Sequence, residues 1–328
     1  MRALLIGGAG LLGRELCSLL SSAGYEVAIC DNFTGSLQYR APKGIRVFSA
    51  NATDLNAMSH VFSVFKPTIV VSCLGHYFAP DSIYKRFDDM RLVLDAANVL
   101  SYLLNTDIKQ VLFCSSHEVY SGSSRKIKES RKAGEPYSHH GAAKLAAESI
   151  LAYQCGLLGI NLCTFRVFDL YGPRQMFCSK TGPLSFLIDA ILTNQQAGLA
   201  GPKRLRDFIH VSDAASALVH AVESNLSGTY NLGTSKGVTF VDICREINRH
   251  LEIVYPPKLM RDSQGKKKSL VADTSLLEQV LPTWSPKVEV LSAIPELIEF
   301  RKQELALYNN SPASSARLLS AMRGRSDV

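Results

Sequence analysis

Two side chains that could exchange a proton with a ligand lie in the segment from Gly134 to Ile150, GEPYSHHGAAKLAAESI. Its pattern is typical of a helix, and positions i and i+4 of a helix share one face. His140 and Lys144 are therefore expected to point the same way. An ordinary histidine has a pKa of about 6.5, so a neutral imidazole can accept a proton near pH 7. A positioned acid–base group typically accelerates a reaction by about 10²- to 10⁴-fold.

A second group of residues could hold a dinucleotide. Gly7, Gly10 and Gly13 stand between a strand pattern and an amphipathic helix pattern in LLIGGAGLLGREL. Gly7 permits a sharp turn, Gly10 lets the backbone approach a pyrophosphate, and Gly13 allows close packing of helix on strand. The helix start, with Leu11 and Leu12, would direct backbone N–H groups and the positive end of the helix dipole at the phosphates.

The acidic residue that ends the next strand predicts the form of the cofactor. Asp31 lies about twenty residues downstream of the glycines, where a carboxylate can accept hydrogen bonds from an adenosine ribose. Its negative charge would repel the 2′-phosphate of NADP, and no arginine that could bind this phosphate stands immediately beside Asp31. NAD is therefore expected rather than NADP.

Further cofactor contacts are expected close to the ends of this and the following strands. These are Asn32, Thr34, Gly35, Asn51, Asp54, Leu55 and Gly75. Two of them have a plain alternative: Asp54 could cap the helix that follows it, and Gly75 could simply end a strand.

These residues need a scaffold, and the rest of the sequence indicates one. Short apolar runs alternate with helical patterns. The strand-like runs cover 3–8, 26–31, 46–50, 68–75, 110–116 and 161–168, and helical patterns at 11–24, 55–65 and 92–105 lie between them. This alternation predicts a parallel sheet covered on both faces. Crossover connections then give a Rossmann-type, doubly wound α/β fold.

The second half of the chain is less regular. Residues 1–168 are expected to form the NAD-binding domain, to which the chain returns at about 207–248. Residues 169–206 and 249–308 are expected to form a smaller, discontinuous substrate-binding lobe. The polar and basic segment 309–328 is expected to be a mobile tail.

Composition narrows the class of protein. The 328 residues are 46% hydrophobic and 20% charged, an ordinary mix for a soluble enzyme, and the net charge of +7 leans only weakly towards anionic substrates. The Lys and Arg residues are scattered, so no nucleic-acid footprint is evident. His210 and His220 have no partner at metal-ligand spacing, so no metal is expected.

The expected location follows from the cysteines and the apolar runs. The eight cysteines form no CxxC pair and suit a reducing cytoplasm. The chain enters a strand at once, without room for a leader, and no apolar run approaches the ~20 residues of a membrane span.

Together, these motifs and others further along the chain resemble those of a known protein family. GGAGLLG, CDNFTG, SSHEVY, HGAAKLAAE, RVFDLYGPRQ, RDFIHVSDAASAL and YNLGTSKGV occur in this order. From Met1 to about Phe300 the chain resembles the extended short-chain dehydrogenase/reductase family, in its nucleotide-sugar epimerase, dehydratase and decarboxylase branch. The resemblance implies an NAD-dependent enzyme of carbohydrate biosynthesis. Members of this family often form a homodimer through two helices of each subunit, and the apolar faces of 92–104 and 140–158 suit such an interface or the core equally.

In that family a Ser or Thr, a Tyr and a Lys form the catalytic set. The Tyr removes a proton from a sugar hydroxyl while NAD accepts the hydride from the same carbon, and the Lys binds the nicotinamide ribose. The resemblance places these roles on Ser116, His140 and Lys144, so a histidine stands where relatives have the tyrosine. Tyr137 could replace it only if the segment is rearranged. Ser115 and Val167 are implied as cofactor neighbours.

Two further departures bear on the reaction. Glu118 follows Ser116 by two residues, as in family dehydratases and decarboxylases, although these dehydratases have an Asp at the position of His117. Glu118 could remove a proton or orient the sugar, or it could serve only in hydrogen bonding. Asp169 stands where relatives have a substrate-contacting Asn. Its charge would repel an anionic substrate unless a nearby cation offsets it. The candidate cations are Arg166, Arg174 and Lys180.

The nucleotide end of the substrate is expected to meet arginines. Arg206 matches the family Arg that grips the nucleotide diphosphate, a task that suits a planar guanidinium fork. Arg261 is a candidate for a second phosphate contact. His76, Asp169 and Arg174 complete the expected substrate set.

The resulting expectation is a 4-epimerase that oxidises C4 of a nucleotide-activated sugar and re-reduces it, with NAD regenerated in each turnover. Glu118 keeps a 4,6-dehydratase or decarboxylase open. Asp169 keeps open a dehydrogenase or reductase of a non-sugar intermediate. His140 keeps open a non-catalytic NAD-binding subunit.

Overall fold

A seven-stranded parallel sheet forms the centre of the computed structural model, in the order β10-β6-β5-β4-β1-β2-β3. Its strands are β1 Arg2–Ile6, β2 Glu26–Asp31, β3 Arg46–Ser49, β4 Ile69–Ser72, β5 Gln110–Ser116, β6 Asn161–Val167 and β10 Gly228–Leu232. The structure describes residues 1–34, 39–75, 83–121, 126–131, 136, 138–175, 182–194, 198–253, 258–260 and 269–309. The Rossmann-type fold predicted from the sequence is confirmed.

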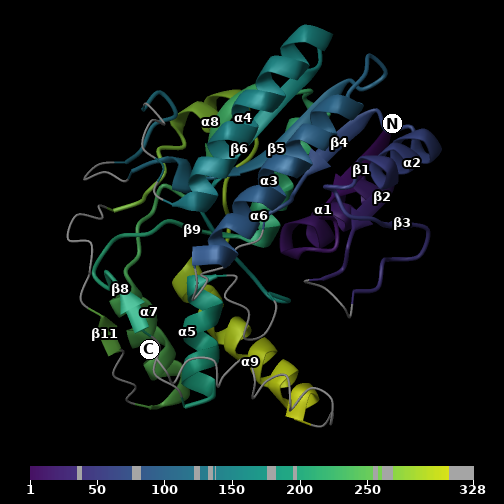
Figure 1. The fold of residues 1–328 in the computed structure, drawn as a ribbon. Helices are drawn as coiled ribbons and strands as arrows, with labels where there is room; N and C mark the ends of the chain where they lie inside the picture. The colour runs from purple at the N-terminus through teal and green to yellow at the C-terminus, as the bar shows by residue number, and fades with distance from the viewer. Residues whose placement is uncertain are drawn as a thin grey trace.

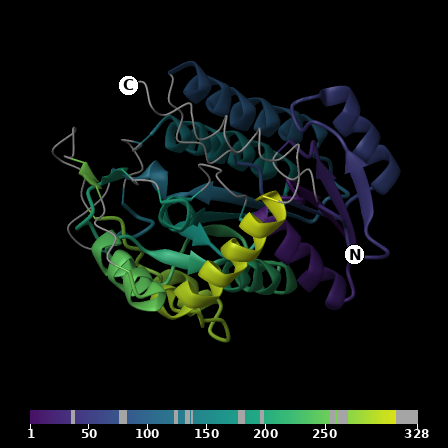
Figure 2. The same cartoon turned by 90° about the horizontal axis from the view of Figure 1, so that it is seen from below.

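Helices cover both faces of this sheet (Figures 1 and 2). One layer is α1 Leu11–Ser22 with α6 Val211–Glu223, and the other is α2 Leu55–Phe65, α3 Ile83–Leu103 and α4 His139–Leu158. Because successive side chains of a strand point to opposite faces, Ala3 and Leu5 lie in the core beneath α1 and α6. Leu4 and Ile6 lie in the core beneath α2, α3 and α4.

Three further helices share a separate core. They are α5 Pro183–Leu192, α7 Phe240–Leu251 and α9 Val290–Asn309, grouped at the lower end of the molecule in Figure 1. The minor elements are η1 His117–Val119, β7 Asp169–Tyr171, β8 Gly198–Ala200, β9 Phe208–His210, β11 Lys258–Met260 and α8 Ser275–Val280. α7 packs in this core, although the predicted boundaries assign its residues up to 248 to the NAD-binding domain. The division into domain and lobe stays a prediction.

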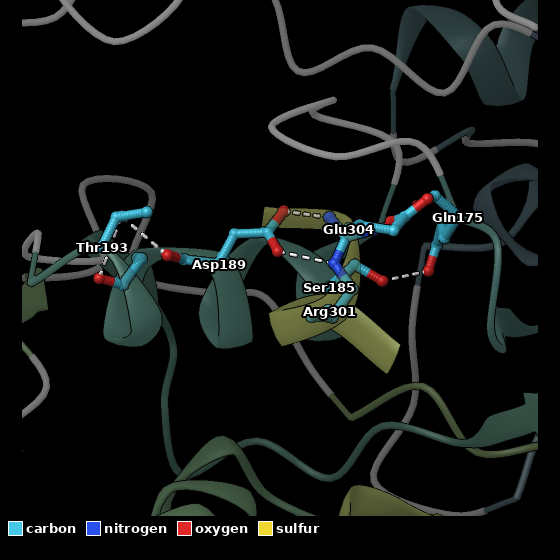
Figure 3. A network of polar contacts seen from close by, with 7 residues as sticks. Gln175, Ser185, Asp189, Thr193, Arg301 and Glu304 are labelled. Atoms are coloured by element: carbon cyan, nitrogen blue, oxygen red, sulfur yellow. Dashed lines mark hydrogen bonds and ion pairs between the residues drawn. The ribbon is translucent and has the colours of Figure 1, made fainter. Parts of the chain in front are cut away.

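A buried ionic network fixes α9 against α5 (Figure 3). Nε of Arg301 donates to Asp189 Oδ1 at 2.7 Å, and its Nη2 donates to the other oxygen. Its Nη1 donates to the carbonyl of Gln175 and, at 2.9 Å, to Glu304. The hydroxyl of Ser185 donates to the side chain of Gln175. The chain after β7 is thereby joined to both helices.

Some predictions fall outside the described residues. The expected tail from 309 onward overlaps the structure only at Asn309, the last residue of α9. Gly35, His76, Tyr137, Lys180 and Arg261 also lie outside it. The seven cysteines within the described ranges are all free thiols.

Candidate active site

The glycine-rich turn after β1 leaves the start of α1 open. Gly7 has a φ of +76° and donates its N–H to the carbonyl of Cys30 at 2.8 Å. A Cβ on Gly13 would lie 2.6 Å from Gly8 Cα. Gly10 is the N-cap of α1 and provides no side-chain acceptor for the first N–H groups, at Leu11 and Leu12. These donors and the helix dipole fit a pyrophosphate.

Asp31 connects the end of β2 to this turn. Its Oδ2 accepts from the Ala9 N–H at 3.0 Å, and its Oδ1 accepts from the Phe33 N–H at 2.8 Å. A carboxylate has about four lone-pair sites, so both oxygens can still accept from a ribose. Beside it, Asn32 Oδ1 accepts from the N–H and the hydroxyl of Thr34, at 3.1 and 2.9 Å.

The turn after β3 is organised by caps. Asp54 Oδ1 accepts from the N–H groups of Asn56 and Ala57, at 2.9 and 3.1 Å, so the capping alternative is confirmed. Asn51 Oδ1 accepts from the Thr53 N–H at 3.2 Å, and the side chain of Leu55 is exposed. Helix capping thus explains the hydrogen bonds of Asp54 without a ligand, and its contact with a cofactor stays a prediction.

Lys144 lies buried at the carboxyl ends of two strands. Its side chain comes from α4, the residue is only 3% exposed, and its Nζ donates to the carbonyls of Leu74 and Cys114 at 2.5 and 2.6 Å. A Cβ on Gly75 would lie 3.7 Å from this Nζ and 3.6 Å from Cε1 of His140. The imidazole and the ammonium therefore meet beside Gly75, as their spacing in one helix predicts.

Ser116 and Glu118 lie where η1 meets the start of α4. Ser116 Oγ accepts from the Glu118 N–H at 3.2 Å. The carboxylate of Glu118 accepts from the hydroxyl of Ser138, the N-cap of α4, which in turn accepts from the Gly141 N–H at 3.0 Å. Glu118 is buried and hydrogen-bonded rather than on the surface.

Gly141 is a site residue that the sequence reasoning missed. A Cβ at this position would lie 2.1 Å from the carbonyl oxygen of Glu118, so only glycine lets α4 pack this closely on η1. Its signal in the sequence is a glycine next to His140 in an otherwise alanine-rich helix.

Ser115 faces a buried network beneath α4. Its hydroxyl donates to Glu148 Oε1 at 2.5 Å, and Arg166 binds the same carboxylate through Nε at 3.1 Å and Nη2 at 2.7 Å. Arg166 also donates to the hydroxyl of Tyr120 at 2.9 Å. Val167, at the end of β6, is buried and pairs with Ser116 in the strand register.

Asp169 is bound by Arg206. The guanidinium donates from Nε to Oδ2 at 2.7 Å and from Nη2 to Oδ1 at 2.5 Å. Burial alone would raise the pKa of Asp169, but the Arg206 guanidinium and the nearby His117 hold it below its ordinary value. The sequence predicts Arg166, Arg174 or Lys180 as the counter-ion of Asp169, and this prediction is corrected here. Arg206 takes that role, and Arg166 pairs with Glu148.

The remaining candidates have simple surroundings. Arg174 is exposed and has a left-handed φ of +67°. Asp207, the residue after Arg206, is buried and accepts hydrogen bonds from Thr234, Ser235 and Ala272. Within the ranges that the structure describes, no cluster of His, Cys, Asp or Glu could hold a metal ion, and no helix is long and apolar enough to cross a membrane.

Known proteins resemble this chain in sequence and in fold. The model of the NAD-dependent epimerase/dehydratase family matches residues 3–233. The UDP-glucose 4-epimerase of Halalkalibacterium halodurans is 23% identical over 321 residues, which cover 90% of this chain and 94% of that protein. UDP-glucuronic acid decarboxylase 1 of Arabidopsis thaliana is 24% identical over 323 residues, 93% of this chain and 71% of that protein.

A solved structure shares the fold. The crystal structure of the UDP-glucose 4-epimerase of Thermotoga maritima with UDP-glucose superposes with a TM-score of 0.83 at 21% identity. The superposition covers 93% of this chain and 100% of that chain.

Proposed function

The chain belongs to the NAD-dependent epimerase/dehydratase family, and on that premise we propose that it inverts C4 of a nucleotide-activated sugar. The observation that carries the proposal is the meeting of His140 and Lys144 beside Gly75 at the carboxyl edge of the sheet. Ligands of doubly wound folds bind at this edge. The similarity to UDP-glucose 4-epimerases along most of the chain supports a UDP-sugar as the substrate.

The residues around the glycine-rich turn fit NAD. The first N–H groups of α1 would bind its pyrophosphate, and Asp31 would accept hydrogen bonds from its adenosine ribose. Lys144, whose ammonium is already fixed by two carbonyls, would hold the nicotinamide ribose. When bound, NAD supplies a hydride acceptor and later returns the hydride to the sugar.

The side chains of the chain itself handle the proton. His140 accepts the proton of the C4 hydroxyl during oxidation and returns it during reduction, and Ser116 hydrogen-bonds the C4 oxygen. This exchange requires a neutral ring at the start of the cycle, and histidine can provide one near pH 7. Because η1 packs directly on the start of α4, Ser116 and His140 would be close enough for both side chains to contact the C4 oxygen.

Decarboxylation or dehydration is the second candidate. Glu118 is buried two residues after Ser116, and one relative is a UDP-glucuronic acid decarboxylase. However, its carboxylate is bound to the hydroxyl that caps α4. This contact favours a role in positioning the helix, so epimerisation ranks first.

A second copy of the chain is the proposed partner. α3 and α4 lie side by side on the outer surface of one helical layer (Figure 1). Tyr102 of α3 is 74% exposed, and Tyr153 and Leu157 of α4 are 70% and 65% exposed. Exposed large apolar side chains on two neighbouring helices favour an interface. Together with the free thiols, which suit a reducing compartment, this supports a cytoplasmic homodimer.

The test is a panel of nucleotide sugars, with the products read by mass spectrometry and NMR. The wild type should interconvert at least one C4 pair without net release of NADH. His140→Ala should lose about 10²- to 10⁴-fold in turnover while it retains NAD. His140→Tyr should keep activity, and His139→Ala, a neighbouring histidine, is the matched control.

Three results would separate the alternatives. Stoichiometric NADH release would indicate a net dehydrogenase. Loss of CO₂ or of water from the substrate would indicate the second candidate. Equal, negligible turnover of the wild type, His140→Ala and His140→Tyr on every substrate would refute the catalytic role of His140.

A further inference from the structure

Arg14 places a cation beside the glycine-rich turn. It lies in the first turn of α1, where its backbone N–H donates to the carbonyl of Gly10 at 3.1 Å. Its side chain turns back over the loop, and its Nε donates to the carbonyl of Ala9 at 2.6 Å. The guanidinium carbon lies 4.7 Å from the centre of the Tyr39 ring, a distance at which a cation and an aromatic face attract each other. These two contacts fix the guanidinium next to the start of α1.

Most of the guanidinium is available to a ligand. The group has five N–H donors, and only the one on Nε meets a hydrogen-bond acceptor in the part of the chain that the structure describes. Arg14 also forms no ion pair with a carboxylate of that part. Its side chain is only partly buried, so a ligand at the start of α1 can reach its Nη donors.

Two carboxylates lie near Arg14, but both bind other groups. Asp31 accepts from two backbone N–H groups, at 3.0 and 2.8 Å. Glu304, in α9, accepts from Arg301 at 2.9 Å. Their charges act on Arg14 from a distance, and neither of them forms an ion pair with it.

A second cation adds to the positive charge at this point. Burial lowers the pKa of Arg14, and the charge of Arg174, in the chain after β7, lowers it further, whereas Tyr39, Asp31 and Glu304 act in the opposite direction. Arg174 is exposed and likewise has no ion pair among the described residues. Two guanidiniums without a carboxylate bound between them repel each other, and a bound anion would offset this repulsion.

We propose that Arg14 binds a phosphate attached to the adenosine of the dinucleotide. A guanidinium fork suits phosphate oxygens. The backbone of Ala9 links the two ends of this site, because its N–H donates to Asp31 and its carbonyl accepts from Arg14. Although no arginine is next to Asp31 in the sequence, the fold brings one there from α1.

Two phosphates could occupy this position. Asp31 would bind the adenosine ribose, so a guanidinium held on the same residue, Ala9, is close to the phosphates of that ribose. These are the pyrophosphate of NAD, on the 5′ oxygen, and the 2′-phosphate that distinguishes NADP. The inference rests on the NAD site of the proposed function and is independent of the reaction that follows.

Arg14→Gln tests the phosphate contact while it preserves the turn. The amide nitrogen of Gln follows Cδ, as Nε does in Arg, so it can still donate to the carbonyl of Ala9. The substitution deletes the positive charge and the Nη donors. Arg245→Gln is the matched control, because it removes the same charge from an exposed side chain of α7.

Calorimetry measures the affinity of the protein for NAD, NADP and ADP after bound nucleotide has been removed, and an NMR titration measures its affinity for adenosine. If Arg14 binds the pyrophosphate, Arg14→Gln should bind NAD and ADP at least about 10-fold more weakly than the wild type, because hydrogen bonds to charged groups are strong. If it binds the 2′-phosphate, only the affinity for NADP should fall by this factor.

Adenosine provides the readout that a merely structural role would move. It should bind Arg14→Gln within about twofold of the wild type, and Arg245→Gln should bind every ligand as the wild type does. Unchanged affinities of Arg14→Gln for NAD, NADP and ADP would overturn the inference and leave the rest of the NAD site standing. An equal loss of adenosine binding would also overturn it, since Arg14 would then only shape the turn. A wild type that binds no dinucleotide would overturn the NAD site itself.

Discussion

Asp169 and Arg206 form a bidentate ion pair between residues 37 positions apart in the sequence. β7 and β9 run parallel, with Asp169 opposite Phe208, and this register brings Arg206 close to the carboxylate. The carboxylate of Asp169 is thus neutralised by Arg206, a residue that the sequence resemblance predicts as a diphosphate contact. In this chain the side chains of Asp169 and Arg206 therefore bind each other.

The ion pair should give stability a measurable dependence on pH. The folded state lowers the pKa of Asp169 from its ordinary 3.8, so the ionised carboxylate stabilises the fold fully above about pH 4. This contribution is lost as the pH falls through the folded pKa. Asp169→Asn removes a charge-assisted contact and should lower the free energy of unfolding near pH 7 by on the order of 2 kcal/mol.

Urea denaturation of the wild type and of Asp169→Asn between pH 7 and pH 3 would measure this effect. The difference in stability between the two proteins should stay constant down to about pH 4 and shrink below it. A difference that is the same at pH 3 and pH 7 would contradict the shifted pKa of Asp169.

Much of the fold could be predicted because its signals are local. The runs 26–31 and 110–116 coincide with β2 and β5, since strands buried on both faces are continuously apolar. The pattern 55–65 coincides with α2, whose N-cap is Asp54. α3 begins at Ile83 rather than at 92, because its first turns carry polar residues that give no apolar periodicity.

The site was only partly predictable, for a different reason. His140 and Lys144 could be placed together because i and i+4 positions share a helix face. The partner of Asp169 and the requirement for Gly141 depend on contacts between elements far apart in the chain. Sequence spacing does not encode such contacts, so the candidate counter-ions Arg166, Arg174 and Lys180 did not include Arg206.

The buried pair beneath α4 should be costly to break. Glu148→Gln leaves the guanidinium of Arg166 without its carboxylate, and removing one partner of a buried pair typically costs about 3–5 kcal/mol. The exposed pair of Lys236 and Glu289 is the control, so Glu289→Gln should leave the melting temperature nearly unchanged. Similar effects of the two substitutions would show that burial does not determine the strength of these pairs.

The attachment of α9 should depend on the shape of the Arg301 side chain. Arg301→Lys keeps the charge but cannot bind both oxygens of Asp189 and the carbonyl of Gln175 at once. The free energy of unfolding should fall by on the order of 2 kcal/mol, and amides of α9 should exchange hydrogen faster. Lys302→Ala, in an exposed pair on the same helix, should change neither quantity. Unaltered exchange in Arg301→Lys would mean that apolar packing alone holds the helix.

Two glycines of α4 offer a matched test of how the site is assembled. A Cβ added to Gly156 would have no neighbouring atom within 4 Å outside its own stretch of helix backbone, so Gly156→Ala should stabilise the protein by up to about 1 kcal/mol, the difference in helix propensity. Gly141→Ala gains the same propensity but places a methyl group 2.1 Å from the carbonyl oxygen of Glu118. The start of α4 must then move away from η1, which separates His140 from Ser116.

Gly141→Ala should therefore lose at least about 10-fold in kcat, because small misplacements of catalytic groups are costly. NAD affinity should fall less than kcat, because Lys144 moves with α4 whereas the glycine-rich turn and Asp31, which would hold the pyrophosphate and the adenosine ribose, are not part of this helix. Turnover assays, NAD titration and thermal melts of both variants provide the comparison. If Gly141→Ala were as stable and as active as Gly156→Ala, the close approach of α4 to η1 would not be what positions the catalytic residues.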